Sequence, residues 1–520
     1  MNDSKHARRL VIRLAAALAI VAPMPAMAQA PEGPLWASYS RALAVLRQGV
    51  QAHGGAEAIQ RLTQVSFRWE GQDYAPTQGR VPSAAFDTTG NGRGNVQEVQ
   101  IDFARNRYTV FRAAPFPGGY LNTFRMAGDG KHFLFHNASA ARGMGGTTYQ
   151  RDTTGAAARR NLALAGANMP VLLLRTALGR ISTLRYLGEH TAGGRLEEAI
   201  TFTTAEGDPV TLYFDAGTHL LTRREDMGLG ALGDEVDVVR FGDYHTEAGL
   251  MVPGTMEMRW NGILTGRHRL ARFAPAAEIP DSLLRPPAGF TEAQPGGPPA
   301  AVQVADGVYY IERIGGGYRM LVVDTDEGLL AVDAPLSPEA TAQAIALIER
   351  TLPGRPLRYV AITHHHADHV GGIPAFAARG ATVLAAAGSE GYLGRMATVR
   401  RTIGRLAAPE PVPAVRIEAV RGRRTIGRGA RRVEVIEVSP TSHASSMLVV
   451  YLPEQKLLFQ GDLLRINREG GPVVSPGATR DLQRIIQQFG LDVRSIGAVH
   501  GENGIPDDLR TALARGSSTP

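Results

Sequence analysis

Four histidines and a carboxylate lie within six consecutive positions of this chain. The run 363–372 reads THHHADHVGG, and it directly follows the apolar, strand-like stretch 357–362. Imidazole and carboxylate groups are the ligands that hold borderline divalent metals in proteins. A loop that leaves a buried strand can direct alternate side chains at one point in a cleft. We therefore interpret the run as part of a metal site and not as a polar surface tract.

Three residues much later in the chain complete the set of candidate ligands. His443 lies in a turn-rich loop between two apolar stretches, Asp462 follows the stretch 456–460, and His500 closes the apolar run 496–499. Each of these residues by itself is more often part of a turn or a core. All three lie at predicted strand ends, however, where the loops of one sheet edge converge. Together with the histidine run, they predict the ligands of one centre.

The elements that must position these residues alternate between strand and helix. From residue 302 onward, the pattern predicts strands at 308–314, 320–324, 328–333, 358–362, 382–386, 432–438, 447–451 and 457–459, and helices at 338–351, 373–379 and 482–489. Such alternation is typical of an α/β layered domain. We therefore predict one α/β domain over residues 302–510.

Strand-like patterns dominate the chain before residue 286. Polar and apolar residues alternate over 65–72, 96–113, 124–136, 210–215, 219–227, 236–244 and 256–273, whereas helical patterns are found mainly at 38–51 and 161–178. This predicts a large, curved antiparallel sheet over residues 38–285 with a few helices against it. The Pro- and Gly-rich stretch 286–301 is predicted to be the linker between the two domains.

The second half resembles a metallo-β-lactamase-fold hydrolase, an αββα sandwich with a binuclear metal site on one edge. The resemblance covers roughly residues 302–505. It rests on the pattern His-x-His-x-Asp-His and on three later ligands, which are matched in order by His364, His366, Asp368, His369, His443, Asp462 and His500. Asp333 matches the structural aspartate near the start of the family's domain.

By this resemblance, two divalent metals share the site. The first metal would be held by His364, His366 and His443, the second by Asp368, His369 and His500, and Asp462 would bridge both. Zinc is the expected metal, with two ions per chain, and iron or manganese are alternatives. His365 is expected to point to the other side of an extended segment and to support the site without binding metal.

The activity that the resemblance implies is that of a zinc-dependent hydrolase. It would cleave an ester, lactone, thioester or related acyl bond by a metal-bound hydroxide, because two cations lower the pKa of water from about 15.7 toward about 7. Asp368 is the predicted catalytic residue, since its carboxylate can orient and deprotonate the water. The substrate would be a small molecule or a lipophilic acyl compound.

The first half loosely resembles the half-barrel domains of periplasmic lipoprotein carriers of the LolA type. The likeness is one of pattern over residues 40–285, around segments such as 54–62, 249–253 and 279–283. A β half-barrel of this kind implies a hydrophobic concavity that can hold an acyl chain. The alternative is a structural domain that only shields or positions its neighbour.

Two other functions stay open on the sequence. Some relatives with this histidine cluster are iron-dependent sulfur oxygenases, and Asp462 and His500 do not require two occupied metals. The other is a carrier of lipophilic ligands with a non-catalytic metal domain, although seven intact ligands argue against it. Lactamase activity is disfavoured, because lactamases carry either a thiolate or no ligand where this chain has Asp462.

The amino terminus predicts export. A basic leader, an apolar core at 14–22 and the small-residue site Ala26-Met27-Ala28 follow one another, which is typical of a signal peptide over residues 1–28. The mature chain is therefore expected in the periplasm or outside the cell. No later stretch is long enough for a stable membrane span. The chain has no cysteine, which excludes disulfides and thiolate ligands.

The charge balance gives no sign of a nucleic-acid partner. The formal net charge of the 520 residues is +7, and the signal peptide carries four basic residues against Asp3, which leaves +4 for the rest. The basic run 421–432, with six arginines, is interpreted as a solvated face, with attraction of an anionic substrate as the alternative. The sequence does not indicate an oligomeric state.

Overall fold

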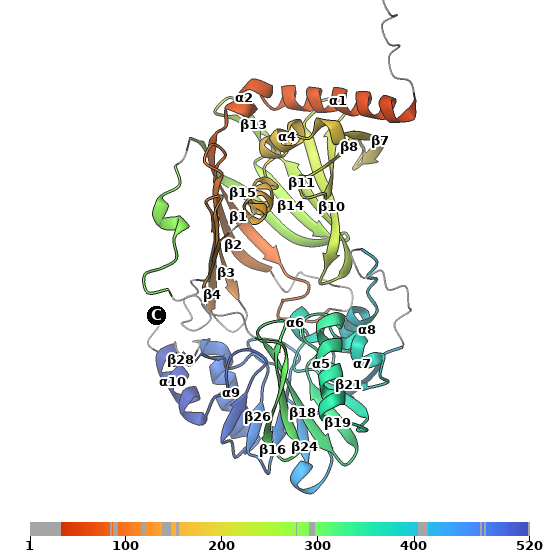
Figure 1. Ribbon diagram of the computed structural model, residues 1–520, viewed down its shortest axis with the longest axis vertical. Coiled ribbons are helices and arrows are strands. Elements are labelled where there is room, and N and C mark those ends of the chain that lie inside the picture. Colours follow the sequence, from red (N-terminus) through yellow and green to blue (C-terminus); the bar gives the residue numbers. More distant parts are fainter. Residues whose placement is uncertain are drawn as a thin grey trace, which may run out of the picture.

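The fold is that of a computed structural model, which describes residues 33–83, 86, 92–116, 120–137, 147–151, 155–276, 278–290, 297–403, 414–467, 471–472 and 475–517. The predicted signal peptide lies outside these residues. Two bodies of different construction lie one above the other along the long axis of the molecule (Figure 1). The upper one is a strongly curved sheet with helices against it, and the lower one is a layered sandwich.

Most of the described strands of the first half form one antiparallel sheet. Its thirteen strands run in the spatial order β6-β5-β4-β3-β2-β1-β15-β14-β11-β10-β9-β8-β7, so most neighbours in sequence pair with each other. Their bounds are β1 Gln64–Tyr74, β2 Gly92–Asp102, β3 Arg107–Phe116, β4 Tyr120–Gly128, β5 His132–Asn137, β6 Thr147–Arg151, β7 Arg185–Ala192, β8 Arg195–Thr203, β9 Pro209–Asp215, β10 Leu221–Gly230, β11 Gly233–Gly242, β14 Thr255–Trp260 and β15 Ile263–Pro275. A separate pair consists of β12 His245–Glu247 and β13 Leu250–Val252. The predicted large antiparallel sheet is confirmed.

Three of the predicted strands are in fact hairpins. The predicted ranges 96–113, 124–136 and 256–273 contain the pairs β2–β3, β4–β5 and β14–β15. Each range is broken by turn residues with positive φ, namely Asn106 at 53°, Gly130 at 81°, and Asn261 and Gly262 at 47° and 82°. The Asp-Gly and Asn-Gly dipeptides at 129–130 and 261–262 are strong hairpin signals, so the sequence contained these two turns.

Helices of the first half fill the apolar part of the curved sheet. They are α1 Pro34–Ala52, α2 Ala56–Arg61, α3 Ala156–Gly166 and α4 Pro170–Leu178. The predicted helix 161–178 is thus two helices, because Pro170 lacks a backbone N–H and begins a new one. α1 crosses one end of the sheet and α4 lies within its curve (Figure 1). Leu172 and Leu174 of α4 join Phe67, Val99 and Phe273 of the sheet in one buried core.

The second half is an αββα sandwich, as predicted. The first sheet, in the order β16-β17-β18-β19-β20-β21-β22, consists of β16 Ala300–Ala305, β17 Val308–Ile314, β18 Tyr318–Thr325, β19 Gly328–Val332, β20 Leu357–Ala361, β21 Thr382–Ala386 and β22 Arg416–Val420. The second sheet, in the order β23-β24-β25-β26-β29, consists of β23 Arg423–Ile426, β24 Val433–Glu437, β25 Leu448–Leu452, β26 Leu457–Phe459 and β29 Ser495–Gly497. The main helices are α5 Pro338–Thr351, α6 Ala367–Val370, α7 Ile373–Ala377, α8 Glu390–Thr398, α9 Pro476–Gln488 and α10 Pro506–Ser517.

Alternation along β19 shows how the layers are built. All five residues of this strand are buried, because helices cover one face of the sheet and the second sheet covers the other. Leu329 and Ala331 face the core that contains Ile345 of α5, whereas Leu330 and Val332 face the core between the two sheets. A strand buried on both faces reads as a continuous apolar run, which made this domain recognisable in the sequence.

The two halves share part of one core. Phe86, from the connection between β1 and β2, is buried against Tyr392 of α8, with ring centroids 5.3 Å apart. Trp260, at the tip of the β14–β15 hairpin, packs against the same core. The Asp234 carboxylate of β11 accepts hydrogen bonds from the backbone N–H groups of residues 402 and 403 at 2.6 and 2.8 Å. The first half is therefore docked on the second through its strand tips and turns.

The predicted linker lies partly outside the described residues, and its last two positions belong to β16, which begins at Ala300. At the other end, α10 extends past the predicted domain end at residue 510 and buries Leu509 and Ala512 in the core that α9 covers. No helix within the described part of the chain is long and apolar enough to cross a membrane.

Candidate metal centre

One edge of the sandwich collects the carboxyl ends of strands from both sheets. β19 and β20 are parallel neighbours in the first sheet, and β26 and β29 are parallel neighbours in the second. β24 has the same direction as β26, since both are antiparallel to β25. The loops that follow these five strands contain Asp333, the histidine run, His443, Asp462 and His500. Candidate ligands far apart in the sequence therefore meet at this edge.

The turn after the histidine run requires glycine. A Cβ atom on Gly371 would lie 2.0 Å from the Leu336 carbonyl oxygen, and one on Gly372 would lie 1.9 Å from Thr341 Oγ1. Both distances are far below van der Waals contact, so any larger residue would push the loop away from the segment that follows β19. The glycine pair therefore holds the ligand loop close against Asp333, which lies at the start of that segment.

The structure brings all seven predicted ligands together in two adjacent groups. Within each group, one ligand atom from every residue lies within 4.8 Å of the others. The first group is His364, His366, His443 and Asp462, and the second is Asp368, His369 and His500. These are the two sets that the resemblance implies, with the bridging aspartate placed in the first.

Asp462 lies between the two groups. Its Oδ2 is 3.6 Å from His443 Nε2 and 3.9 Å from His364 Nε2 in the first group. Its Oδ1 is 3.3 Å from His369 Nε2 and 3.6 Å from His500 Nε2 in the second. The carboxylate thus offers one oxygen atom to each group, which is the arrangement that a bridging ligand needs.

The donor set fits divalent cations. His364 Nε2 and His443 Nε2 lie 3.1 Å apart, and His369 Nε2 and Asp462 Oδ1 are buried without a hydrogen-bond partner among the described residues. A buried polar atom without a partner costs about 1–3 kcal/mol, and a cation that accepts its lone pair removes that cost. Imidazole nitrogens with carboxylate oxygens, in a chain without cysteine, are typical of zinc, iron or manganese sites.

Electrostatics keep His364, Asp368 and Asp462 in the forms that bind metal. Burial, together with the neighbouring imidazoles, holds the pKa of His364 well below its usual value. Burial alone would raise the pKa values of Asp368 and Asp462, but His369 and His500 beside them lower both. A neutral imidazole and an ionised carboxylate are the protonation states that a metal requires of its ligands. Burial alone would lower the pKa of His369, but Asp462 and Asp368 raise it well above its usual value, so this imidazole must lose a proton when a metal binds.

Asp333 orients the second group. Its buried carboxylate accepts hydrogen bonds from Thr363 N at 2.6 Å and from Thr363 Oγ1 at 2.7 Å, and its Oδ2 lies 3.0 Å from His369 Nδ1. A carboxylate on one ring nitrogen fixes the ring and leaves the other nitrogen for the metal. Asp333 does this from a left-handed backbone with φ 67°, a conformation uncommon for residues other than glycine.

The first half contributes directly to the site through residues 77–80, which follow β1. Gln78 Nε2 donates to Asp368 Oδ1 at 2.6 Å. His366 Nε2 donates to the Gly79 carbonyl oxygen at 2.9 Å, which leaves His366 Nδ1 for the metal. The Thr77 carbonyl also accepts a hydrogen bond from Ala367 N at 2.8 Å.

Arg80 extends this contact to the loop that carries His443. Its guanidinium donates to the Thr441 carbonyl at 3.1 and 3.2 Å, and its own carbonyl accepts from Ser445 N at 2.8 Å. Sequence reasoning missed the segment 77–80, because neither its composition nor its position marks it. Only the docking of the two halves places it over the ligands.

Tyr318 is the other residue that the sequence did not single out. Its hydroxyl donates to Asp368 Oδ2 at 3.2 Å, and its ring packs edge-on against His500 with centroids 4.6 Å apart. Burial, and then the charge of Asp368, raises the pKa of Tyr318, so the hydroxyl keeps its proton. A tyrosine at the start of a strand is ordinary, which is why it carried no signal.

Two further predictions concern residues outside the ligand groups. His365 belongs to neither ligand group; its ring is buried against Tyr392 at 5.3 Å, and burial lowers its pKa to about 3. The arginines of the basic run 421–432 are largely paired with carboxylates. Arg423 reaches Glu434 at 3.0 Å and Arg431 reaches Asp324 at 2.9 Å. This pairing favours the solvated face over an anion site.

Fold and site together define a metal-dependent enzyme domain of the metallo-β-lactamase type. Residues 315–494 match the model of the metallo-beta-lactamase superfamily, so the second half is a domain of that superfamily. The predicted placement of this domain is confirmed, and so is the predicted enzyme class at the level of the superfamily. His500 lies just beyond the matched residues.

Three similar proteins each match only part of this chain. The alpha subunit of 2,4-dinitroanisole O-demethylase from Nocardioides sp. (strain JS1661) is 26% identical over 147 residues, which are 28% of this chain and 41% of that protein. The chain thus spans less than half the length of this curated relative. A metallo-beta-lactamase from Pontibacter korlensis is 21% identical with a TM-score of 0.33, over 43% of this chain and 100% of its own. The inverting sec-alkylsulfatase Pisa1 from Pseudomonas sp. is 17% identical with a TM-score of 0.31, over 42% of this chain and 41% of its own.

Proposed function

We propose that the chain is a secreted, zinc-dependent hydrolase that cleaves an ester, lactone, thioester or related acyl bond. The observation that carries the proposal is the pair of ligand groups that share the carboxylate of Asp462. Two divalent cations held there would polarise a carbonyl and lower the pKa of water to about 7. The first cation would be held by His364, His366 and His443, the second by Asp368, His369 and His500, and both by Asp462.

Asp368 is the residue placed to orient the water that attacks. Gln78 and Tyr318 donate to its two oxygens and fix the plane of the carboxylate. The low pKa of Asp368 keeps it ionised, so it acts only as a hydrogen-bond acceptor. A water molecule beside it therefore turns a proton toward Asp368 and a lone pair toward the carbonyl carbon.

The proposal of a secreted enzyme rests on the predicted signal peptide at residues 1–28. The alternative of a lipophilic-ligand carrier is weakened by the first half itself. The apolar part of its concave face is filled by side chains of α4, such as Leu172 and Leu174, which pack on the sheet. An acyl chain would have to displace this core.

Metal content and activity of the purified mature protein test the proposal together. We expect about two zinc ions per chain and hydrolysis of acyl esters or lactones that is lost on chelation and restored by zinc. The relative that demethylates an aryl methyl ether makes such an ether a useful additional substrate. About one iron per chain with uptake of oxygen would instead support a sulfur oxygenase and overturn the proposal.

A further inference from the structure

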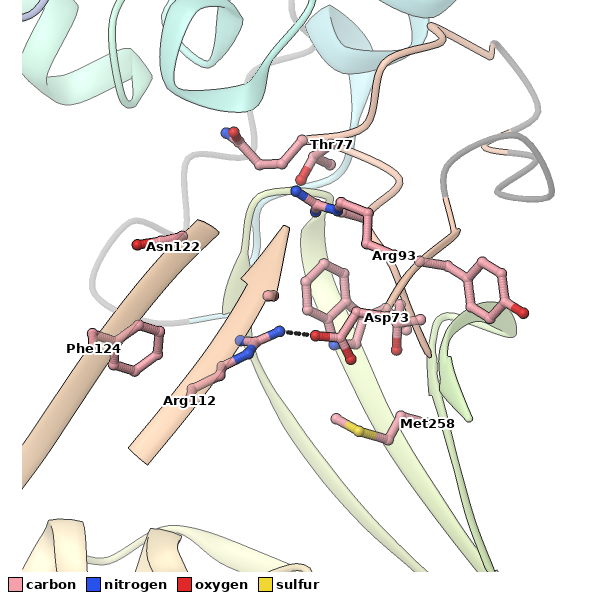
Figure 2. Close-up of a pocket in the computed structure, with 13 residues that line it drawn as sticks. Asp73, Thr77, Arg93, Arg112, Asn122, Phe124 and Met258 are labelled. Atoms are coloured by element: carbon pink, nitrogen blue, oxygen red, sulfur yellow. Dashed lines mark hydrogen bonds and ion pairs between the residues drawn. The ribbon is translucent and has the colours of Figure 1, made fainter. Parts of the chain in front are cut away.

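A cavity in the first half lies directly beside the metal centre. It has a volume of about 290 Å³ and is lined by residues of β1, β2, β3, β4, β14 and β15 together with the segment that follows β1. Figure 2 shows it between these strands and the elements of the second half, with Thr77 and Arg93 on the side nearest the second half. The apolar core with α4 occupies another part of the same sheet and does not fill this cavity.

Gln78 joins the cavity to the metal centre. Its side chain lines the cavity, and its amide nitrogen donates to Asp368 Oδ1 at 2.6 Å. Thr77 also lines the cavity, while its carbonyl oxygen holds Ala367 N at 2.8 Å within the ligand loop. A molecule bound in the cavity would therefore lie within the length of one glutamine side chain of a predicted ligand.

The walls of the cavity are of two kinds. Phe124, Met258 and Trp260 provide aromatic and thioether surfaces, which pack on flat rings. Arg112 and Asn122 provide donors, and Arg112 is itself anchored by the Asp73 carboxylate (Figure 2). Asp73 is the one acid on the described walls, against two guanidinium groups.

A buried hydroxyl on the wall lacks a partner. Thr265 lines the cavity and is only 6% exposed, and its Oγ1 has no hydrogen-bond partner among the described residues. Buried hydroxyls are nearly always paired, with protein or with another molecule. Thr265 therefore leaves a hydroxyl on this wall that can bond to a polar group of a bound molecule.

We propose that this cavity binds the part of the substrate that does not react, an aryl group of one or two rings that carries a hydrogen-bond-accepting substituent such as a carboxylate. The proposal rests on the proposed hydrolase and specifies its substrate class. Size supports it, because a cavity of about 150 Å³ holds one benzene ring, and this one is about twice as large. The rings pack on Trp260 and Phe124 while the substituent meets Arg112 and Thr265.

Binding of 2-naphthoate to the metal-free full-length protein tests the cavity without any catalysis. Calorimetry should show one molecule bound per chain. Ala114 lines the cavity, so Ala114→Trp should fill it and weaken binding by about twentyfold or more. Ala113→Trp is the matched control on the opposite face of β3, and it should bind within about twofold of wild type. Absence of binding to wild type, or equal effects of the two tryptophans, would overturn the proposal.

A conservative variant guards against misfolding of the filled cavity. Thr265→Val keeps the shape and removes the hydroxyl, and it should weaken naphthoate binding by about fivefold, the value of one hydrogen bond. Unchanged affinity would contradict the assigned contact with the substituent.

Kinetics on two esters separate this proposal from the proposed function. On zinc-loaded protein, Ala114→Trp should lower kcat/KM for 6-carboxy-2-naphthyl acetate by about tenfold or more and leave ethyl acetate within about twofold. Hydrolysis of both esters without naphthoate binding would overturn the cavity and keep the hydrolase. Naphthoate binding blocked by Ala114→Trp, with neither ester hydrolysed, would keep the cavity and count against the hydrolase.

Discussion

Two sets of half-buried acidic residues, one in each half, behave in opposite ways. At the metal centre, Asp368 and Asp462 have pKa values below the usual range, because imidazoles surround them and outweigh burial. In the first half, burial and the neighbouring acids Asp226 and Glu235 raise the pKa of Asp237 to about 6. Asp226 and Asp237 are direct cross-strand partners on β10 and β11, with like charges opposed.

The difference lies in the partners and not in the burial. The acids of the first half lie close to one another, and their nearby cations are Arg224, whose Nη2 is 3.6 Å from Asp226 Oδ1, and Arg401 beside Glu235. Binding a proton relieves the repulsion between their carboxylates, which is why the pKa of Asp237 is raised. The acids of the second half face histidine nitrogens, and a metal cation can bind both the carboxylates and these nitrogens. Among the described residues, only the second set forms groups with metal-ligand spacing.

Removing the shared carboxylate of the second set should have the largest effect. Asp462→Ala takes one oxygen from each ligand group, so we expect kcat/KM to fall on the order of 1,000-fold, equivalent to about 4 kcal/mol. Bound zinc, measured by mass spectrometry, should fall with it. Asp326→Ala, an exposed aspartate outside the centre, is the control. Wild-type turnover in Asp462→Ala would refute the role of this residue as the bridge.

Asp333, which belongs to neither ligand group, should contribute mainly to the stability of the fold. Asp333→Ala leaves Thr363 N, Thr363 Oγ1 and His369 Nδ1 without their acceptor in a fully buried place. We expect a loss of about 3 kcal/mol in the free energy of unfolding of the metal-free protein, measured with urea. A loss below about 1 kcal/mol would show that the three donors find other partners.

A substitution in the first half should affect metal binding less than the loss of a ligand does. Gln78→Leu removes the hydrogen bond to Asp368 Oδ1 and should lower zinc affinity about tenfold, the usual effect of losing a residue that orients a ligand. Competition with a chromogenic chelator measures this. Gln303→Leu, an exposed glutamine of β16, should leave affinity unchanged. Equal affinities in both variants would mean that the halves are coupled only by packing.

Replacing Asp237 of the first half should have the smallest effect, a change in how the free energy of unfolding depends on pH. Folded Asp237 keeps its proton up to about pH 6, whereas an unfolded aspartate releases it near pH 3.9. The folded state therefore binds more protons in this window, and its stability falls as the pH rises through it. Asp237→Asn should flatten this fall and add about 1 kcal/mol near pH 8 in urea titrations, after allowance for partial exposure. A steeper fall in the variant would reverse the assignment.

The apolar runs of the second half allowed its individual strands and helices to be predicted from the sequence. Predicted segments such as 328–333 and 338–351 closely match β19 and α5, because a strand buried on both faces gives a continuous apolar run and an amphipathic helix gives a clear period. The strand boundaries of the first half were harder to predict, because the alternating pattern of polar and apolar residues continues across its tight turns. The periodicity runs across Gly130 and Asn261, and only the local dipeptides mark the breaks.

The sequence by itself determined the chemistry of the centre: which residue types occur, in what order, and at strand ends of a layered α/β domain. The tertiary structure alone decided which atoms meet. It turned Nε2 of His366 to Gly79 and so left Nδ1 for metal, brought Gln78 to Asp368, and opened a cavity on the other side of Gln78. The physical reason is that these contacts join residues nearly 300 positions apart, for example 290 between Gln78 and Asp368. Local periodicity cannot encode such contacts, because they arise only when the sheets of the two halves dock.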